Sequence, residues 1–393
     1  MKGGVNTVDK IAIIGSGILA KVFADRAKEI GIETHCFSFD KNDVACHSVD
    51  YFHEINIFDT DTIVDICKKN GIGGVVATTE LTILPVARVA KKLGLLGNRE
   101  NVAAEITNKY LTRNKVSGVT GLSQPAFWVY QEGDIPNVNE CLPVIVKPIA
   151  AGGKRGVSVV YDSELIESAV TNALSYSKVK GVLIEEYLDG GSEYSVESLS
   201  YKGKHRVFQV TQKDTSGPPH CNELGHHQPA NISSEMRENV ERVISGMLDA
   251  VGIENGPCHT EIKIINNKIY LIEINARPGG DHITYPLTEL STGYPYISAI
   301  MWAALGKYEE HKPQKLERNY CGIYFVTEET AYLKPVFDCC ENYRWLYHKN
   351  KVSDEPSKIQ FNDEENLNYF IYYDVNEKPN IERILLEINK ESC

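Results

Sequence analysis

The alternation of apolar and polar positions predicts a regular order of strands and helices at the start of the chain. Residues 10–15, KIAIIG, form a short apolar run that is typical of a buried strand. A helical pattern over 21–31 follows, and residues 33–40 predict a second strand that ends at Asp40. Further strand–helix pairs continue to about residue 105, which predicts a small parallel sheet covered by helices.

The middle of the chain changes to strand pairs and one long helix. Residues 142–160 and 181–200 each contain two apolar runs joined by a glycine-containing turn. Residues 233–252 repeat apolar positions at helical spacing, with Ser233 or Ser234 as the N-cap and Gly252 as the stop. From about residue 306 the pattern becomes strand-rich again and ends in a helical segment.

The hairpin predicted over residues 257–283 carries the strongest polar pattern. Its two β runs are separated by Asn266-Asn267, residues that favour a turn. In the second strand, Glu273, Asn275 and Arg277 are spaced two apart, so their side chains lie on one face. Glu261 lies on the paired strand. Carboxylate and amide oxygens suit Mg²⁺, and a guanidinium suits a phosphate or a carboxylate.

Composition narrows the function classes. The chain has 393 residues, enough for two or three domains, with 42% apolar and 24% charged residues. A net charge of −12 argues against nucleic acid as a main partner. No apolar run is long enough for a membrane helix, and the first residues lack a signal core, so we expect a cytoplasmic protein. The ten cysteines lack paired metal spacings, which favours reduced thiols.

A glycine motif near the N-terminus permits a second interpretation. The sequence GSGILA at 15–20 follows the first strand, and Asp40 comes about 20 positions later. This spacing matches the dinucleotide-binding fingerprint in its alanine variant, so an NAD(P)-dependent oxidoreductase is one alternative. The same glycines also serve a tight strand-to-helix turn without any ligand.

The hairpin letters resemble a known family. Glu261 and Glu273 are separated by 11 residues and are followed by Asn275, Arg277 and Pro-Gly-Gly. This order resembles the metal-binding strands of the ATP-grasp superfamily in its carboxylate–amine ligase branch. The resemblance implies an α/β and α+β protein with three parts. These are a Rossmann-like pre-ATP-grasp domain (1–107), a two-lobed ATP-grasp domain (108–305, lid lobe about 115–190) and a small C-terminal α+β domain (306–393).

The resemblance also implies the nucleotide site. Lys109 and Lys147 would contact the phosphates, with Lys115 as a weaker competitor for the first role. The loop after Lys147 would cover the phosphates through Gly152, Gly153 and Gly156. The segment Glu185, Glu186, Tyr187 and Leu188 would be the hinge that holds adenine, and Glu193 would hold the ribose. Glu261, Glu273 and Asn275 would hold Mg²⁺, with Mn²⁺ as the alternative ion.

A histidine-rich loop at 211–231 has two interpretations. His220, Cys221, His226 and His227 invite a zinc site, although their spacing is not typical of one. The pattern E-x-G-H-x-x-P-A, residues 223–230, instead resembles a segment that lines the amino-acid pocket of L-amino-acid ligases. The candidate substrate-binding residues are Glu223, His226, Arg277, Gly280 and His282.

The implied activity is an ATP-dependent ligase that forms a C–N bond. ATP would convert a substrate carboxylate into an acyl phosphate, and an amine would then displace the phosphate, with Arg277 and Lys147 as the catalytic residues. Two amino acids joined into a dipeptide are the leading substrates, and a homodimer is the commonest assembly for such proteins. Purine-pathway or biotin-carboxylase-like ATP-grasp enzymes are alternatives within the class. A non-catalytic ATP-binding protein is an alternative outside it.

Overall fold

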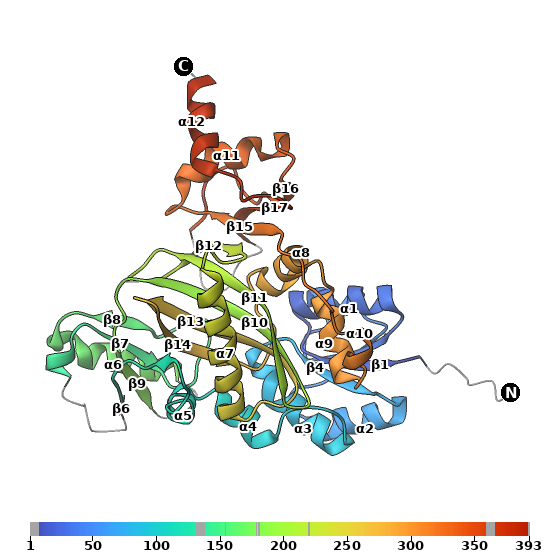
Figure 1. Ribbon diagram of the computed structural model, residues 1–393. Coiled ribbons are helices and arrows are strands. Elements are labelled where there is room, and N and C mark those ends of the chain that lie inside the picture. The colour runs from blue at the N-terminus through green and yellow to red at the C-terminus, as the bar shows by residue number, and fades with distance from the viewer. Residues whose placement is uncertain are drawn as a thin grey trace.

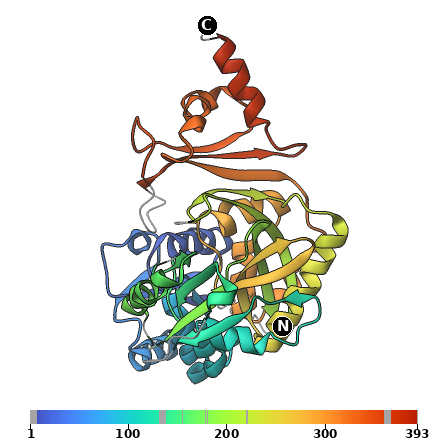
Figure 2. The ribbon, with the colours of Figure 1, turned by 90° about the vertical axis from the view of Figure 1, so that its left-hand side faces the viewer.

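The strands of the protein form three sheets. We describe it from a computed structural model, using residues 8–130, 138–153, 155–177, 179, 181–218, 221–358 and 366–391. Figure 1 shows the N-terminal sheet beside a large central sheet, with a small sheet on the other side. In Figure 2, turned by 90°, the last strands and the C-terminal helix again rise above the rest of the molecule.

The N-terminal sheet is parallel and has the order β3-β2-β1-β4. Its strands are β1 (Lys10–Ile14), β2 (Glu33–Ser38), β3 (Tyr51–Glu54) and β4 (Gly74–Ala77). The connecting helices are α1 (Ile18–Ile30), α2 (Thr60–Asn70) and α3 (Ile83–Leu93). Each ends at a glycine in the left-handed conformation, where a side chain would be strained. The predicted parallel sheet is therefore confirmed.

Two short helices connect this sheet to a second, antiparallel one. They are α4 (Glu100–Ile106) and α5 (Lys109–Lys115). The second sheet has the order β6-β9-β7-β8, and α6 (Ile166–Tyr176) covers one of its faces. Its strands are β6 (Phe127–Tyr130), β7 (Val144–Pro148), β8 (Ser158–Val160) and β9 (Val182–Glu186). Because Val144, Val146 and Ile184 pack toward α6, Lys147 and Glu185 face the other side.

The central sheet has nine strands. In spatial order they are β16 (Leu346–Asn350), β17 (Asn368–Asp374), β15 (Tyr320–Val326), β12 (Glu223–Gln228), β11 (Lys204–Thr215), β10 (Ser192–Tyr201), β13 (Gly256–Ile265), β14 (Lys268–Asn275) and β5 (Leu122–Ser123). Neighbouring strands are antiparallel except β14 and β5, which are parallel.

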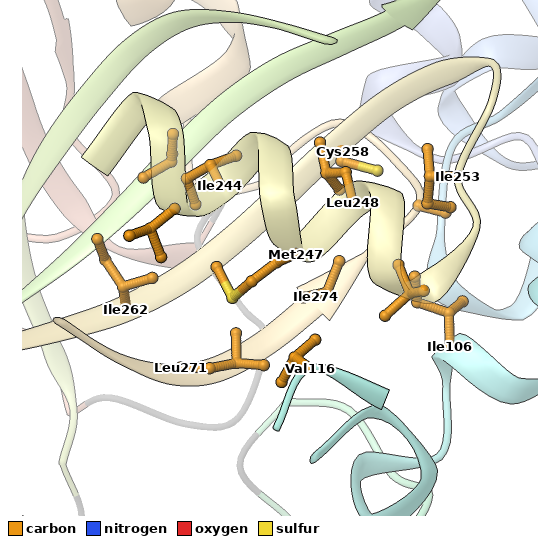
Figure 3. Packing of buried hydrophobic residues seen from close by; sticks show 14 of the residues in the cluster. Ile106, Val116, Ile244, Met247, Leu248, Ile253, Cys258, Ile262, Leu271 and Ile274 are labelled. Atoms are coloured by element: carbon orange, nitrogen blue, oxygen red, sulfur yellow. The ribbon is translucent and has the colours of Figure 1, made fainter. Parts of the chain in front are cut away.

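Helix α7 (Ser234–Val251) covers one face of the predicted hairpin, and its predicted caps are confirmed. The Ser233 side chain accepts a hydrogen bond from the amide of Met236, and Gly252 ends the helix. Figure 3 shows Met247 of α7 packed against the hairpin residues Ile262, Leu271 and Ile274. Each fully buried side chain of this kind contributes roughly 1.5–3 kcal/mol to folding. The hairpin is thus held from behind, and its polar face stays available.

The segment after the hairpin links the N-terminal sheet to the central sheet. It contains a π-helical stretch (Ile283–Thr288), then α8 (Glu289–Thr292), α9 (Tyr296–Ala304) and α10 (Tyr308–His311). One apolar cluster joins α9 to α1, to the strand β1 and to the central strands β10 and β11. The N-terminal sheet is therefore held against the central sheet through α9.

The C-terminal segment does not form a sheet of its own. Strand β15 pairs with β12 in antiparallel register, so the central sheet continues through it to β17 and β16. Helices α11 (Lys334–Cys339) and α12 (Ile381–Glu391) cover this end of the sheet. The predicted boundaries at residues 107 and 305 stay a prediction. Across the described ranges, every helix is too short or too polar to span a membrane.

Candidate active site

The two predicted metal carboxylates face each other across the hairpin. Glu261 of β13 and Glu273 of β14 are cross-strand partners. A β-bulge next to this pair changes the phase of β14, so that Leu271 and Ile274 both reach the core while Glu273 lies on the polar face. Asn275, two residues further, shares that face and is paired with His259. The hairpin therefore brings the predicted metal ligands together.

Each of these carboxylates already contacts a lysine. The Lys109 ammonium, at the start of α5, donates to Oε1 of Glu273 (2.8 Å) and to the carbonyl of Ala151 (2.9 Å). Lys213 of β11 donates to Oε1 of Glu261 (3.0 Å). Burial opposes the charge on both lysines, but Glu273 raises the pKa of Lys109, and the carboxylates around Lys213 raise the pKa of Lys213. Positive charge thus occupies the positions where a divalent cation would be stabilised.

This donor set fits Mg²⁺. Two opposed carboxylates and a buried amide are hard oxygen ligands on one strand pair, and the lysines beside them show that the site demands positive charge. Burial alone would raise the pKa of Glu261, yet Lys213 holds that pKa well below its ordinary range. Glu261 is therefore ionised and available as a ligand at neutral pH.

A buried charge triad places Lys147 on the opposite wall. Glu185 of β9 accepts from Nε of Arg113 (2.5 Å) and also contacts the ammonium of Lys147. All three side chains are less than a tenth exposed. Burial favours the neutral acid, but the two cations outweigh it and lower the pKa of Glu185 to about 2. Burial also lowers the pKa of Lys147. The side chain of Glu185 therefore orients the predicted phosphate lysine.

The predicted hinge and ribose residues lie next to each other. Lys263 of β13 donates to the carbonyl of Leu188 (2.7 Å) and lies 3.9 Å from Oε1 of Glu193. Its ammonium also lies over the ring of Tyr187. Glu186 is exposed and accepts a hydrogen bond from the amide of Ala126 (3.3 Å). Lys263 therefore connects the predicted hinge to Glu193, the predicted ribose residue.

A cavity opens beside this strand pair. Its volume is about 410 Å³, and its lining includes Glu193, Lys213 and Lys263 of the central strands together with Tyr324 and Tyr332 of the C-terminal segment. The C-terminal segment therefore forms one wall of the space next to the predicted nucleotide site.

The glycine loop lies between the second sheet and the N-terminal sheet. Gly153 and Gly156 adopt positive φ angles, which glycine tolerates without strain. A Cβ on Gly152 would lie 2.3 Å from Oε2 of Glu80, which follows β4. The loop therefore reaches the carboxyl edge of the N-terminal strands. Its predicted mobility stays a prediction.

The comparisons with known proteins agree with this arrangement. Residues 140–285 match the family described as ATP-grasp domain, a range that includes Lys147, Glu185 and the whole hairpin. This part of the chain contains an ATP-grasp domain.

Individual relatives of this chain have different names. The C-terminal section of the carbamoyl phosphate synthase large chain from Aquifex aeolicus is 29% identical over 51% of this chain and 37% of its own length. A formate-dependent phosphoribosylglycinamide formyltransferase from Methanocaldococcus jannaschii is 24% identical over 77% of each chain. An L-amino acid ligase from Bacillus licheniformis has a similar fold, with a TM-score of 0.77 and 20% identity over 98% of this chain and 97% of that one. The chain therefore spans little more than a third of the first relative.

Arg277 contacts the backbone of the turn that follows the hairpin. Its guanidinium donates to the carbonyl of its own neighbour Pro278 (2.8 Å). Within the described ranges it makes no ion pair with Glu261 or Glu273. The role of Arg277 in catalysis stays a prediction.

The zinc interpretation of the histidine loop is not supported. His226 and His227 are consecutive residues of β12, so their side chains point to opposite faces. His227 contacts Asp214 (2.8 Å), whereas His226 lies 3.0 Å from Glu223. His220 lies outside the described residues.

The predicted substrate residues lie on two adjoining segments. Glu223 and His226 belong to β12, and Gly280 and His282 follow the hairpin. His282 stacks against Tyr369 of β17, with ring centroids 4.8 Å apart. Burial, followed by the nearby His226 and His348, lowers the pKa of His282 to about 4. His282 is therefore neutral at physiological pH.

Sequence reasoning missed a buried pair behind the metal carboxylates. Glu197 of β10 accepts from Thr284 (2.7 Å) and from the amide of Gly279 (3.2 Å), and it lies 2.5 Å from Nδ1 of His259. The other ring nitrogen of His259 lies 3.4 Å from Glu261. Burial opposes protonation, but Glu197 raises the pKa of His259 to about 9. The sequence did contain a signal for this pair, because polar residues alternate along β10 and β13. His259 lies two residues before Glu261, so the two side chains share one face of the strand.

We expect Gly279→Ala to disturb this pair. The new Cβ would lie 2.5 Å from Nδ1 of His259 and 2.7 Å from Oε1 of Glu197, so the turn must shift. The cost in unfolding free energy should be roughly 1–3 kcal/mol, as for other overpacked positions. Urea unfolding measures it. Gly118→Ala is the matched control, because a Cβ there meets nothing within 4 Å. Equal stability of the two variants would contradict this account.

Proposed function

We propose that the protein is an ATP-dependent carboxylate–amine ligase. The observation that carries the proposal is the opposed pair Glu261 and Glu273, with Lys109 beside it and the buried Lys147 on the facing sheet. Phosphoryl transfer depends mainly on positioning and on neutralising negative charge. An arrangement of two carboxylates and several lysines on two lobes supports that chemistry.

The residues would divide the work as follows. Lys147, oriented by Glu185, and Lys109 would bind the phosphates of ATP, and the loop at Gly152, Gly153 and Gly156 would close over them. Backbone groups of residues 185–188 would hold adenine, and Glu193 would bind the ribose. Glu261, Glu273 and Asn275 would hold Mg²⁺, or Mn²⁺ in its place. When bound, such an ion neutralises phosphate charge.

The reaction would have two steps. The γ-phosphoryl group of ATP passes to an oxygen of the substrate carboxylate, which gives an acyl phosphate and ADP. A neutral amine then attacks the acyl carbon, the C–O bond to phosphate breaks, and the nitrogen loses one proton to the departing phosphate as the amide forms. Arg277 would stabilise the transferring phosphoryl group through guanidinium donors other than the one that contacts the Pro278 carbonyl. The closed loop would keep water from the acyl phosphate.

We further propose that both substrates are amino acids. The similarity in fold to the L-amino acid ligase over 98% of the chain supports this, together with the polar side chains of Glu223, His226 and His282 next to the hairpin. A cytoplasmic location and a possible homodimer are parts of the same proposal.

A second candidate is an ATP-grasp enzyme of the purine type. The relative from Methanocaldococcus jannaschii, which matches 77% of each chain, favours it. The oxidoreductase alternative is weaker. Among the described residues, Asp40 accepts a hydrogen bond from its own loop, and Ser16 of the glycine motif is bonded to Ser38 and Asp43.

The test of this proposal is phosphate release from Mg²⁺-ATP with single L-amino acids and with pairs. We expect release that requires a particular pair and a product one water lighter than the sum of the two. Release with formate or bicarbonate in place of an amino acid would favour the second candidate. Saturable binding of NAD(P)H with no ATP turnover would contradict both.

Lys147→Ala should chiefly weaken nucleotide binding. A charge-assisted hydrogen bond contributes about 1.5–3 kcal/mol, so ADP affinity should fall roughly 10- to 100-fold. Calorimetric titration with ADP measures it. Lys312→Ala is the matched control, because Lys312 contacts Glu309 on the surface of the molecule. Unchanged ADP affinity in Lys147→Ala would show that Lys147 is not a phosphate lysine.

A further inference from the structure

Lys263 is a lysine on the polar face of the hairpin to which sequence reasoning gave no role. It is the cross-strand partner of Glu193 in β10 and lies two residues after Glu261 in β13, so all three side chains share one face of the sheet. The side chain of Lys263 is 12% exposed, and that of Glu193 is 21% exposed. Both residues line the cavity of about 410 Å³. The pair is therefore shielded from bulk water, and a ligand can reach it from that cavity.

The turn between the predicted hinge and Glu193 lies directly against the strand that carries Lys263. Gly190 and Gly191 both have positive φ angles, which glycine adopts without strain. A Cβ on Gly191 would lie 2.3 Å from the carbonyl oxygen of Ile264, the residue after Lys263. A glycine is therefore needed for this close backbone approach. The turn brings the hinge, Glu193 and Lys263 together.

The ammonium of Lys263 has donors that the protein does not use. It donates a hydrogen bond to the carbonyl of Leu188 (2.7 Å), and it lies 5.7 Å from the centre of the Tyr187 ring. Leu188 is its only hydrogen-bond acceptor in the part of the chain that the structure describes. Oε1 of Glu193 lies 3.9 Å away, which is too far for a direct hydrogen bond. Because an ammonium carries three N–H donors, two of them stay available to a ligand.

The gap between Lys263 and Glu193 fits a hydroxyl group. A hydroxyl can accept one hydrogen bond and donate another, at donor–acceptor distances of about 2.7–3.0 Å. The observed gap of 3.9 Å is shorter than two such bonds, so one oxygen can contact both groups. Glu193 would repel a phosphate, and Lys263 would repel a cation, so a neutral group matches the pair best. We propose that Lys263 and Glu193 together bind one ribose hydroxyl of the nucleotide, and that Lys263 thereby selects ribonucleotides.

This role of Lys263 rests on the proposed ATP-dependent function and adds a specificity-determining residue to it. A nucleotide without that hydroxyl would leave a donor of Lys263 and the carboxylate of Glu193 without the partner that they share. Sites that are built around a hydroxyl discriminate against analogues that lack it, because their polar groups are then left unpaired. Hydrogen bonds to charged groups are the stronger ones, so the ribonucleotide should bind about 10-fold more tightly.

The experiment is a calorimetric titration of the full-length protein with ADP, 2′-deoxy-ADP and 3′-deoxy-ADP in the presence of Mg²⁺. The two analogues show which hydroxyl the pair binds. We expect the parent to bind ADP about 10-fold more tightly than it binds one of them. Lys263→Met removes the ammonium and keeps an unbranched side chain. It should weaken ADP binding about 10-fold and leave the affinity for that analogue within about 3-fold. Glu193→Ala should remove the same discrimination between the sugars.

Lys268→Met is the matched control, because Lys268 is an exposed lysine of the same hairpin. It should keep both the affinity for ADP and the discrimination, and thermal unfolding establishes that each variant is folded. Equal losses for ADP and both analogues in Lys263→Met would overturn the proposal, because they would show that Lys263 only supports the hinge. Equal affinity of the parent for all three nucleotides would also overturn it. A parent that binds none of the three would contradict the ATP-dependent function itself, and this role with it.

Discussion

Glu273→Ala should lower ADP formation by on the order of 10³-fold, because it removes a charged ligand from the proposed metal site. The substitution also leaves the Lys109 ammonium without its carboxylate partner at 2.8 Å. Both effects weaken the binding of the phosphates in the transition state. Initial rates of ADP formation at saturating Mg²⁺-ATP measure the loss.

The control for Glu273→Ala is an exposed carboxylate of the same type. Glu310 of α10 is exposed, so Glu310→Gln should leave the rate unchanged. Because the side chain of Glu273 is 19% exposed, its removal should affect stability much less than activity. Near-normal ADP production by Glu273→Ala would show that the hairpin carboxylates do not bind the catalytic metal.

Glu185→Ala should have the largest effect on stability. It leaves Arg113 and Lys147 buried without the carboxylate that neutralises them. Breaking a buried ion pair by removing one partner costs about 3–5 kcal/mol. Urea unfolding should therefore give a much lower midpoint than in the parent. Glu186→Ala is the matched control, because the next residue is exposed and contacts only a backbone amide at 3.3 Å among its described partners. A loss of equal size in the two variants would contradict the buried triad.

The pH dependence of this triad follows from the pKa of Glu185. That pKa is lowered from an ordinary value of 4.5 to about 2 in the folded protein. A lowered pKa stabilises the folded state fully above pH 4.5 and progressively less as the pH falls toward 2. We expect the free energy of unfolding of the parent to fall over this range. The difference between the parent and Glu185→Ala should become smaller across the same range.

In this site, charged side chains are paired with side chains of opposite charge before any ligand binds. Lys109 neutralises Glu273, Lys213 neutralises Glu261, and Glu185 neutralises Lys147. Each charge that we propose for phosphoryl transfer is thus held in place by an opposite charge. Binding of Mg²⁺-ATP would exchange these contacts for contacts with phosphate and metal, so the lysines keep the site folded in its absence.

The sequence alone was sufficient to predict several helices and strands, and to predict on which face of a strand a side chain lies. The hairpin with its Asn266-Asn267 turn and the long helix from Ser233 to Gly252 are present as predicted. So is the placement of Glu273 and Asn275 on one face. These features follow from local periodicity, caps and turn residues, which are written in consecutive positions of the chain. The sequence resemblance to the ATP-grasp superfamily added the order of the predicted nucleotide-binding motifs. The family match covers the part of that order that lies within residues 140–285.

Only the tertiary structure decided which charges meet. Arg113 and Glu185 are 72 residues apart, Lys213 and Glu261 are 48 apart, and Lys109 and Glu273 are 164 apart. No local pattern connects such positions, because the pairing depends on how the second sheet and α5 close over the hairpin. The β-bulge at Glu273 and the approach of Asp281 to His226 depend on packing in the same way. Local spacing determines the direction of each side chain, and the packing of distant elements determines its partner.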